Sequence, residues 1–138
     1  MVTRVLGTNV IVKWFLREEG TPQAEVFLQE LEQGRTRILA PTSLRYELAN
    51  VLWSRRRDGL SEADAAQAWA EFVRLPVELR EELDLIAEAL RFSFQQRISP
   101  YDSVFVVLAR ELGCSFVTAD VPLFSRVHGS CPWVKLLG

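Results

Sequence analysis

The chain has 138 residues, of which 49% are hydrophobic and 25% are charged, and its formal net charge is −2 at pH 7. This length and composition are typical of one globular domain spanning residues 1–138, with a core that needs neither disulfides nor structural zinc. The slightly acidic balance argues against a generally basic nucleic-acid scaffold. A nucleic-acid ligand would have to be held by a few positioned arginines and by metal ions.

No segment predicts a membrane span or a secretion signal. The apolar run at 10–16 is interrupted by Lys13, is too short to cross a bilayer, and lacks a small-residue cleavage site. Cys114 and Cys131 have no metal-ligand spacing, and we expect both to be free thiols in a reducing compartment. The sequence therefore predicts a cytoplasmic protein without a membrane partner.

Strand and helix patterns alternate along the chain. The predicted strands are short and apolar, and they span 2–6, 37–40, 116–118 and 134–137. The predicted helices have capping residues or prolines at their starts, and they span 10–17, 21–34, 44–57, 62–74, 83–96 and 100–113, with a short one from 120. The helix at 100–113 is apolar on every side and should be covered on most of its circumference. This alternation favours a parallel sheet with helices on both faces.

Glu47 lies on the apolar seam of the helix at 44–57, between Leu44 and Val51. Its carboxylate should therefore face inward. An unpaired buried carboxylate is costly, so it must either meet a cation or hold a proton. A salt bridge to a neighbouring arginine is the ordinary explanation, and a metal ion is the alternative.

Asp102 and Asp120 each have a structural explanation of their own. Asp102 forms a capping-box spacing with Ser99, and Asp120 precedes a short helix as a preferred N-cap. Their location adds a second reason, because Gly7 and Asp120 both follow strands, at the carboxyl ends where open α/β sheets bind ligands. Together with Glu47, these acids predict a site for Mg²⁺ or Mn²⁺.

Four segments, at 5–10, 46–48, 101–104 and 116–120, carry these polar residues in a fixed order. Together they resemble the signature blocks of PIN-domain ribonucleases, and most closely those of VapC toxins from toxin-antitoxin pairs. The resemblance implies a three-layer α/β/α sandwich with a short, mostly parallel central sheet. It also implies a Mg²⁺-dependent endoribonuclease, with Mn²⁺ as a substitute, that cleaves RNA, forms a homodimer and is neutralised by a VapB-like antitoxin.

By matching positions, the resemblance implies that Glu47, Asp102 and Asp120 are the catalytic and metal-binding acids. Asn9 and Thr118 would orient ligands through hydrogen bonds. In such a site the metal ion lowers the pKa of its bound water and stabilises the leaving alkoxide.

Gly7 stands where family members carry an aspartate. Because one ligand is missing, the resemblance implies weaker metal binding and an inactive or attenuated enzyme. Gly7 could reflect divergence into a binding-only protein or a deliberate inactivating replacement, and the intact acids elsewhere favour the replacement. A third explanation is a left-handed or crowded backbone at the joint between strand and helix.

Two other classes of function compete with the nuclease. A non-catalytic PIN-like module would bind RNA or protein without cleaving it, although such a module has no reason to bury Glu47. A phosphoacceptor receiver domain needs adjacent acids after its first strand, which Gly7, Thr8 and Asn9 do not supply. Basic residues near the rim could contact RNA, and the candidates are Lys13, Arg17, Arg45 and Arg97. Aromatic residues that could serve either the core or a partner surface are Trp14, Phe15, Trp53 and Trp69.

Overall fold

The computed structural model describes residues 1–138 and contains one five-stranded sheet in which all neighbouring strands are parallel. The strands are β1 (Val2–Leu6), β2 (Thr36–Pro41), β3 (Glu78–Arg80), β4 (Ser115–Thr118) and β5 (Val134–Leu136). Their order across the sheet is β3-β2-β1-β4-β5. In the central strand, Val5 pairs with Leu39 of β2 on one side and with Phe116 of β4 on the other.

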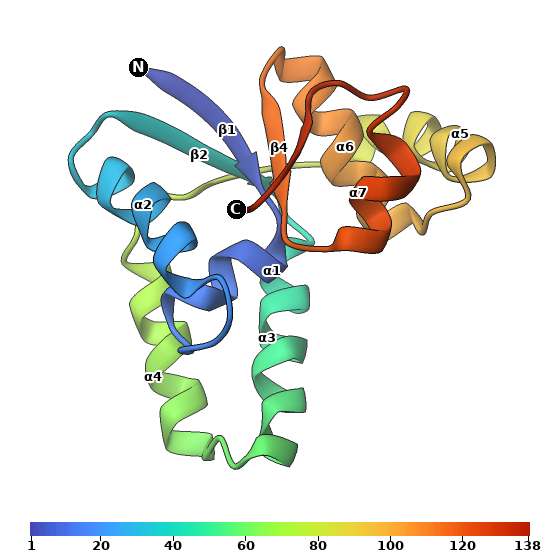
Figure 1. Ribbon diagram of the computed structural model, residues 1–138. Helices are drawn as coiled ribbons and strands as arrows, with labels where there is room; N and C mark the ends of the chain where they lie inside the picture. The colour runs from blue at the N-terminus through green and yellow to red at the C-terminus, as the bar shows by residue number, and fades with distance from the viewer.

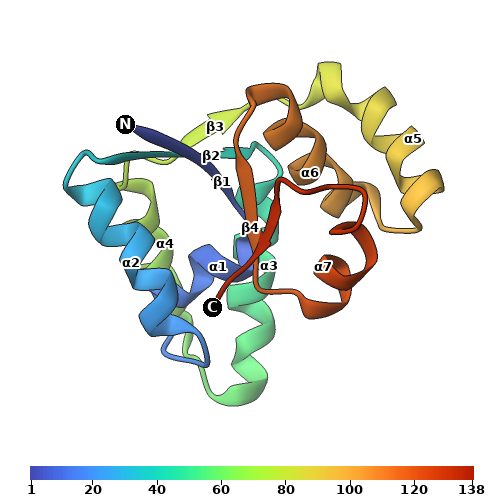
Figure 2. The ribbon, with the colours of Figure 1, turned by 45° about the horizontal axis from the view of Figure 1, so that its top comes forward.

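Helices cover both faces of this sheet. The α-helices are α1 (Thr8–Ile11), α2 (Thr21–Glu32), α3 (Leu44–Ser54), α4 (Glu62–Val73), α5 (Ile86–Gln96), α6 (Pro100–Leu112) and α7 (Val121–Val127). Three 3-10 helices span Val12–Trp14, Arg55–Asp58 and Leu83–Leu85. Figure 2 shows the strands running between α2 and α4 on one side and α5 and α6 on the other. In Figure 1, α3 and α4 project together beyond the sheet as a hairpin. The predicted α/β/α architecture with a parallel sheet is confirmed.

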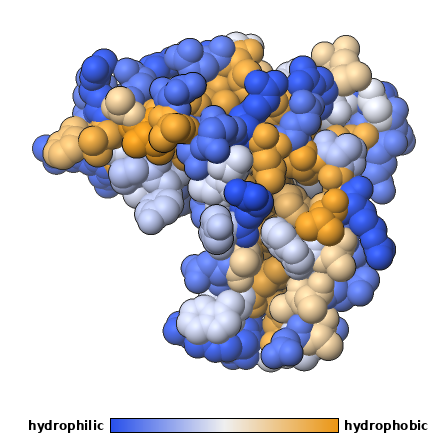
Figure 3. Space-filling view, turned by 180° about the vertical axis from the view of Figure 1, so that it is seen from behind, coloured by the Kyte–Doolittle hydropathy of each residue, from blue (hydrophilic) through white to orange (hydrophobic).

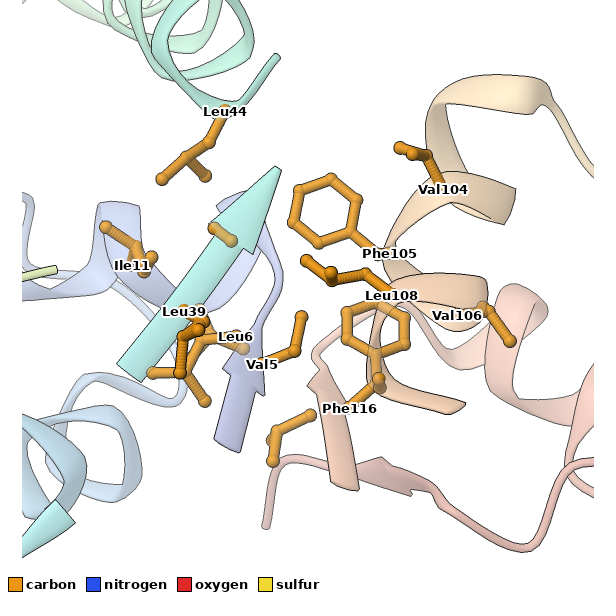
Figure 4. Packing of buried hydrophobic residues seen from close by; sticks show 14 of the residues in the cluster. Val5, Leu6, Ile11, Leu39, Leu44, Val104, Phe105, Val106, Leu108 and Phe116 are labelled. Carbon is orange, nitrogen blue, oxygen red and sulfur yellow. The ribbon is translucent and has the colours of Figure 1, made fainter. Parts of the chain in front are cut away.

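The core occupies both faces of the sheet, and α6 contributes a continuous buried segment to one of them. All residues of α6 from Ser103 to Ala109 are buried, because α6 lies between the sheet and α5. Phe105 stacks on Phe116 with ring centroids 5.5 Å apart, and Figure 4 shows Phe105 and Leu108 pointing from α6 toward the sheet. The prediction that this helix is covered around most of its circumference is therefore confirmed.

The first helix differs from its prediction. It begins at Thr8 rather than Val10, changes to 3-10 geometry after Ile11, and has Gly7 as its N-cap without a side-chain cap. The predicted capping residues Thr8 and Asn9 instead direct their side chains to distant parts of the chain, Thr8 to α3 and Asn9 to the end of β4. The local sequence showed that Thr8 and Asn9 can form hydrogen bonds, but it could not predict partners so distant along the chain.

Strand β3 was not predicted, since three residues at the sheet edge carry no alternation that could be recognised. The other helices begin and end close to the predicted positions, and the Ser61 hydroxyl caps α4 by accepting from the Asp64 amide at 3.1 Å. Cys114 and Cys131 are free, as expected. None of the helices combines the length and apolar character needed to cross a bilayer.

The four aromatic residues of uncertain role divide between core and surface. Trp14, Phe15 and Trp69 pack against the core, whereas Trp53 is exposed beneath the Arg56 guanidinium. A groove of about 460 Å³ between α3 and α4 is lined mainly by apolar residues, including Trp53 and Trp69. Figure 3 shows hydrophobic side chains gathered between these two helices, at the bottom of the view.

Candidate active site

The carboxyl ends of the five parallel strands share one rim of the sheet. From β1 the chain proceeds to β2 and β3 on one side, whereas β4 and β5 occupy the other side. Open α/β sheets bind ligands in the crevice where the strand order reverses in this way. Gly7 directly follows β1 and Thr118 ends β4, so both lie at that point.

A pocket of about 260 Å³ occupies this position. It is formed by the end of β1, the start of α1, the middle of α3, the start of α6 and the end of β4. Its lining residues are Gly7, Thr8, Asn9, Glu47, Asn50, Val51, Asp102, Phe105, Phe116, Thr118 and Leu123. Figure 1 places the starts of α1 and α3 at this rim of the sheet.

Glu47 enters the pocket from α3 and has no cationic partner. Its two carboxylate oxygens accept hydrogen bonds from the hydroxyls of Thr8, at 3.4 Å, and Ser43, at 3.2 Å. The pKa of Glu47 is raised to about 7, mainly by burial and also by the negative charges of Asp102 and Glu82, whereas the two hydroxyl hydrogen bonds act in the opposite direction. No ion pair in the chain includes Glu47. The salt-bridge explanation for this buried carboxylate is therefore wrong.

Asp102 lies in the first turn of α6, beside the N-cap Ser99, and lines the pocket. The Ser99 hydroxyl accepts from the Asp102 amide at 3.2 Å and donates to the Asp102 carboxylate at 3.3 Å. Burial raises the pKa of Asp102 above its usual range, the Ser99 hydrogen bond lowers it, and the charge of Asp120 raises it. Asp102 thus interacts electrostatically with both of the other acids, with Glu47 on one side and with Asp120 on the other.

Asp120 lies beside the pocket that Glu47 and Asp102 line. One of its carboxylate oxygens accepts from the Leu123 amide at 3.0 Å as the N-cap of α7, and the residue does not line the pocket. The structure holds no group of three or more histidine, cysteine, aspartate or glutamate side chains placed to hold a metal ion together. The chain thus brings Glu47 and Asp102 into one pocket, with Asp120 beside it.

Asn9 and Thr118 join the start of α1 to the end of β4. The Asn9 side-chain oxygen accepts from the Ala119 amide at 3.0 Å, and its nitrogen donates to the Thr118 hydroxyl at 3.3 Å. That hydroxyl also accepts from the Asp120 amide at 3.1 Å. These bonds fix the backbone that carries Asp120 against the strand end that carries Gly7.

Gly7 does not need the conformational freedom of glycine. Its φ of −71° and ψ of 158° are extended values open to any residue, so the explanation by a left-handed backbone is wrong. A Cβ here would lie 3.1 Å from the Asn9 side-chain oxygen, 3.3 Å from a ring carbon of Phe116 and 3.5 Å from the Val117 carbonyl. The first two distances are shorter than an ordinary van der Waals contact, so the joint is crowded, and the side chains of Asn9 and Phe116 would have to give by a few tenths of an ångström. Since Asn9 and Phe116 line the pocket, a side chain at position 7 would project into it.

Several residues that shape the site were not recognised in the sequence. Thr8 and Ser43 orient Glu47, and the spacing of Ser43 and Glu47 on one helical turn was a signal that could have revealed half of this contact. Glu82 accepts hydrogen bonds from the backbone amide and the hydroxyl of Thr42 and adds negative charge near Glu47. No signal pointed to Glu82, because it follows the short strand β3.

Comparison with known proteins places this arrangement in a family. The family model for the PIN domain matches residues 4–129. The chain belongs to the PIN-domain family. Ribonuclease VapC3 of Pyrobaculum aerophilum is 29% identical over 127 residues, which cover 88% of this chain and 92% of that protein. Ribonuclease VapC9 of Mycobacterium tuberculosis is 32% identical over 77 residues, which cover 56% of this chain and 59% of that protein.

Two solved structures share the fold of this PIN domain. PAE2754 from Pyrobaculum aerophilum superposes with a TM-score of 0.64 at 21% identity, covering 91% of this chain and 86% of that one. VapBC2 from Rickettsia felis, bound to a DNA fragment from its promoter, gives a TM-score of 0.64 at 18% identity, covering 98% of this chain and 97% of that one.

The donor chemistry of the PIN-domain pocket fits a divalent cation, although the ligand set is small. Glu47 and Asp102 supply two half-buried carboxylates whose pKa values are raised by burial and by neighbouring negative charge. The lining includes no lysine, arginine or histidine that could neutralise them. A hard cation with oxygen ligands relieves this combination of desolvation and repulsion. Position 7, which faces the same pocket, contributes no carboxylate.

Proposed function

We propose that this PIN domain is a VapC-type endoribonuclease toxin that hydrolyses RNA with the help of Mg²⁺ or Mn²⁺, and that Gly7 leaves it inactive or attenuated. One observation carries the proposal. Two carboxylates with raised pKa values share a pocket at the switch point of the sheet, and no basic side chain among the lining residues balances them. The ribonuclease names of the similar VapC proteins support the same reaction.

Glu47 and Asp102 would hold the cation, with Asp120 close enough to add a third acid. When bound, a divalent ion acidifies a coordinated water and stabilises the charge that develops on the leaving oxygen. Thr8 and Ser43 hold the Glu47 carboxylate in place. Because the pKa of Glu47 is about 7, Glu47 must give up a proton near neutral pH before it can ligate a cation.

The proposal includes a regulatory partner. A cognate VapB-like antitoxin would neutralise the nuclease in the cytoplasm, and the support for it is the likeness to the VapBC2 structure. The substrate would be RNA, as the names of the similar VapC ribonucleases suggest.

We also propose that the protein forms a homodimer through α5. Three large exposed apolar residues follow one another at helical spacing on α5, at positions Ile86, Leu90 and Phe94, and Leu83 of the preceding 3-10 helix is exposed as well. The opposite side of α5 is already buried against α6. Figure 3 shows the exposed apolar band at the upper left, where α5 lies.

The charges beside this band suit a second copy of the same helix. Asp84 lies in the 3-10 helix at the start of the band, and Arg91, which forms an ion pair with Glu88 at 3.0 Å, lies near its end. In an antiparallel pair related by a two-fold axis, each Asp84 would lie nearly level with Arg91 of the other copy. The apolar band and the two symmetric ion pairs are the reasons for proposing that a second copy of the chain binds to this face of α5.

The alternative function is a non-catalytic PIN-like module that binds RNA or protein. Two observations favour it, the glycine at position 7 and the lack of a group of three acids placed around one ion. The two functions differ in what a restored carboxylate would do.

The deciding experiment is a cleavage assay with Gly7→Asp, using Gly7→Asn as a neutral control of the same size. The nuclease proposal predicts that both variants fold, that only Gly7→Asp cleaves RNA, and that cleavage needs Mg²⁺ or Mn²⁺ and is lost on adding Asp102→Asn. A Gly7→Asp protein that folds and binds the cation but leaves RNA intact would support the binding module instead.

A further inference from the structure

Glu82 is a carboxylate close to the pocket that is not among its lining residues. It directly precedes the 3-10 helix at Leu83–Leu85, is partly buried, and forms no ion pair in the chain. A carboxylate withdrawn from water needs a cation or hydrogen-bond donors. The donors come from one residue, Thr42, which lies 40 residues away in sequence.

This contact joins β3 to the start of α3. One carboxylate oxygen of Glu82 accepts hydrogen bonds from the backbone amide of Thr42, at 2.9 Å, and from the Thr42 hydroxyl. The same amide also donates to the carbonyl of Arg80, the last residue of β3, at 3.0 Å. Thr42 directly follows β2, and the next residue, Ser43, is the N-cap of α3. Glu82 therefore fixes the backbone immediately before α3.

The start of α3 depends on an outside contact because its own N-cap side chain is used elsewhere. The Ser43 hydroxyl makes no capping hydrogen bond and instead donates to the Glu47 carboxylate at 3.2 Å. The N-terminus of a helix carries partial positive charge, which a nearby carboxylate stabilises. Glu82 supplies that negative charge from another segment, so the Ser43 hydroxyl is available to orient Glu47.

We infer that Glu82 is a positioning residue of the cation site, which acts through Thr42 to fix the start of α3 and thereby sets Ser43 and the Glu47 carboxylate. The inference rests on the proposed function, in which Glu47 ligates a divalent cation. Glu82 would touch neither the cation nor its ligands. Residues that support a metal ligand from behind typically change metal affinity about ten-fold or more when they are removed.

A role through charge alone is the alternative to positioning. The negative charge of Glu82 raises the pKa of Glu47, so it acts on this carboxylate across space as well. A charge effect needs no hydrogen bond to Thr42, whereas positioning needs the bond and not the charge. Glu82→Gln separates the two roles, because its side-chain oxygen can still accept from Thr42 although the charge is gone.

The first measurement is Mn²⁺ affinity by isothermal titration in the Gly7→Asp protein, in about 0.15 M salt to screen distant charges. We expect Glu82→Ala to weaken binding about ten-fold, and Glu82→Gln to bind within about three-fold of the parent because screening attenuates the lost charge. Glu81→Ala is the matched control and should bind like the parent. Glu81 is an exposed acid one residue earlier, and its carboxylate accepts only from the Leu83 amide, at 3.3 Å.

The second measurement needs no metal. Amide hydrogen exchange is followed in the unmodified chain at Tyr46 and Glu47, whose amides donate to the Ser43 carbonyl at 3.1 Å in the first turn of α3. Glu82→Ala should accelerate exchange at these two amides several-fold. Glu82→Gln and Glu81→Ala should not, and the buried body of α6 should exchange at the same rate in all variants.

Three results would overturn the inference. They are an unchanged Mn²⁺ affinity in Glu82→Ala, an equal loss of affinity in Glu82→Ala and Glu82→Gln, and unchanged exchange at the start of α3. In each case Gly7→Asp still binds Mn²⁺, so the proposed nuclease site would survive. A Gly7→Asp protein that binds no Mn²⁺ would remove the proposed site and this inference together.

Discussion

Glu47 combines burial with like-charged neighbours, and its titration should be visible in the stability of the fold. Its pKa rises from 4.5 to about 7, with burial as the main cause. Between these values the folded state keeps a proton that the unfolded state releases. The free energy of unfolding therefore falls as the pH rises through this range, and the loss is complete above the folded-state pKa.

The substitution Glu47→Gln removes this titrating group while keeping its shape. We expect the variant to gain stability relative to the unmodified chain as the pH rises from about 4.5 to above 7, by about 1 to 2 kcal/mol after solvent screening at the half-buried site is allowed for. Urea unfolding at several pH values measures the difference. A difference that does not change with pH would mean that Glu47 titrates normally.

At this scale the sequence predicted the direction of Glu47 but not its surroundings. The apolar seam from Leu44 to Val51 was sufficient to turn the carboxylate inward. The Thr8 hydroxyl that donates to it lies 39 residues away in sequence, and Glu82, whose negative charge raises its pKa, lies 35 residues away (82 − 47), so no local pattern relates them. The sequence could not predict that Glu47 lacks an arginine partner, because ion pairing depends on tertiary position.

Among the elements, α1 is joined to the end of β4 by the side-chain hydrogen bonds of Asn9. Replacing Asn9 by alanine removes its bonds to the Ala119 amide and the Thr118 hydroxyl. We expect a loss of about 1 to 3 kcal/mol in the free energy of unfolding, because a backbone amide in the part-buried joint loses its acceptor. Denaturant titration tests this.

Asn50→Ala is the matched control for Asn9→Ala, since Asn50 lines the same pocket from the exposed side of α3. Its effect should stay within about 0.5 kcal/mol. If the two variants lost equal stability, the hydrogen bonds of Asn9 would not contribute specifically to the free energy of unfolding.

The exposed face of α5 yields a prediction about assembly. In the proposed antiparallel pair, Asp84→Arg alone would set the introduced guanidinium against Arg91 twice, and Arg91→Asp alone would set two acids against each other. Each single variant should therefore dimerise at least several-fold more weakly than the unmodified chain, whereas an equimolar mixture should form a heterodimer. Analytical ultracentrifugation distinguishes these states. A monomeric unmodified chain, or a mixture no better than its components, would exclude this interface.

Element boundaries were predictable where the signal was local. Proline and serine at the start of α6 and glycine after its end marked this helix almost to the residue. The start of α1 was misplaced because the capping capacity of Thr8 and Asn9 serves tertiary bonds instead. Strand β3 was missed since its pairing with β2, and not its own composition, makes it a strand.

For the molecule as a whole, the sequence predicted a parallel sheet but not the order of its strands. That order, β3-β2-β1-β4-β5, creates the switch point between β1 and β4 and so brings the segments at 7–9, 47, 102 and 118 to one pocket. Alternation of strands and helices is compatible with several orders. The family resemblance, rather than periodicity, indicated which acids belong together.

The same strand order determines what a side chain at position 7 would meet. Gly7 lies directly after the central strand and lines the pocket, and its extended backbone conformation is open to any residue. An aspartate there would add a third carboxylate to those of Glu47 and Asp102, with small shifts of Asn9 and Phe116 to admit its Cβ. Metal affinity should thus respond to position 7 more strongly than stability does.

Isothermal titration of Mn²⁺ into the unmodified chain, Gly7→Asp and Gly7→Asp with Asp102→Asn tests this convergence of acids most directly. We expect one ion per chain, bound at least ten-fold more tightly by Gly7→Asp than by the unmodified protein, and loss of that gain when Asp102 becomes asparagine. If Mn²⁺ bound all three proteins alike, or none of them, the carboxylates would not share an ion and the nuclease site would not exist.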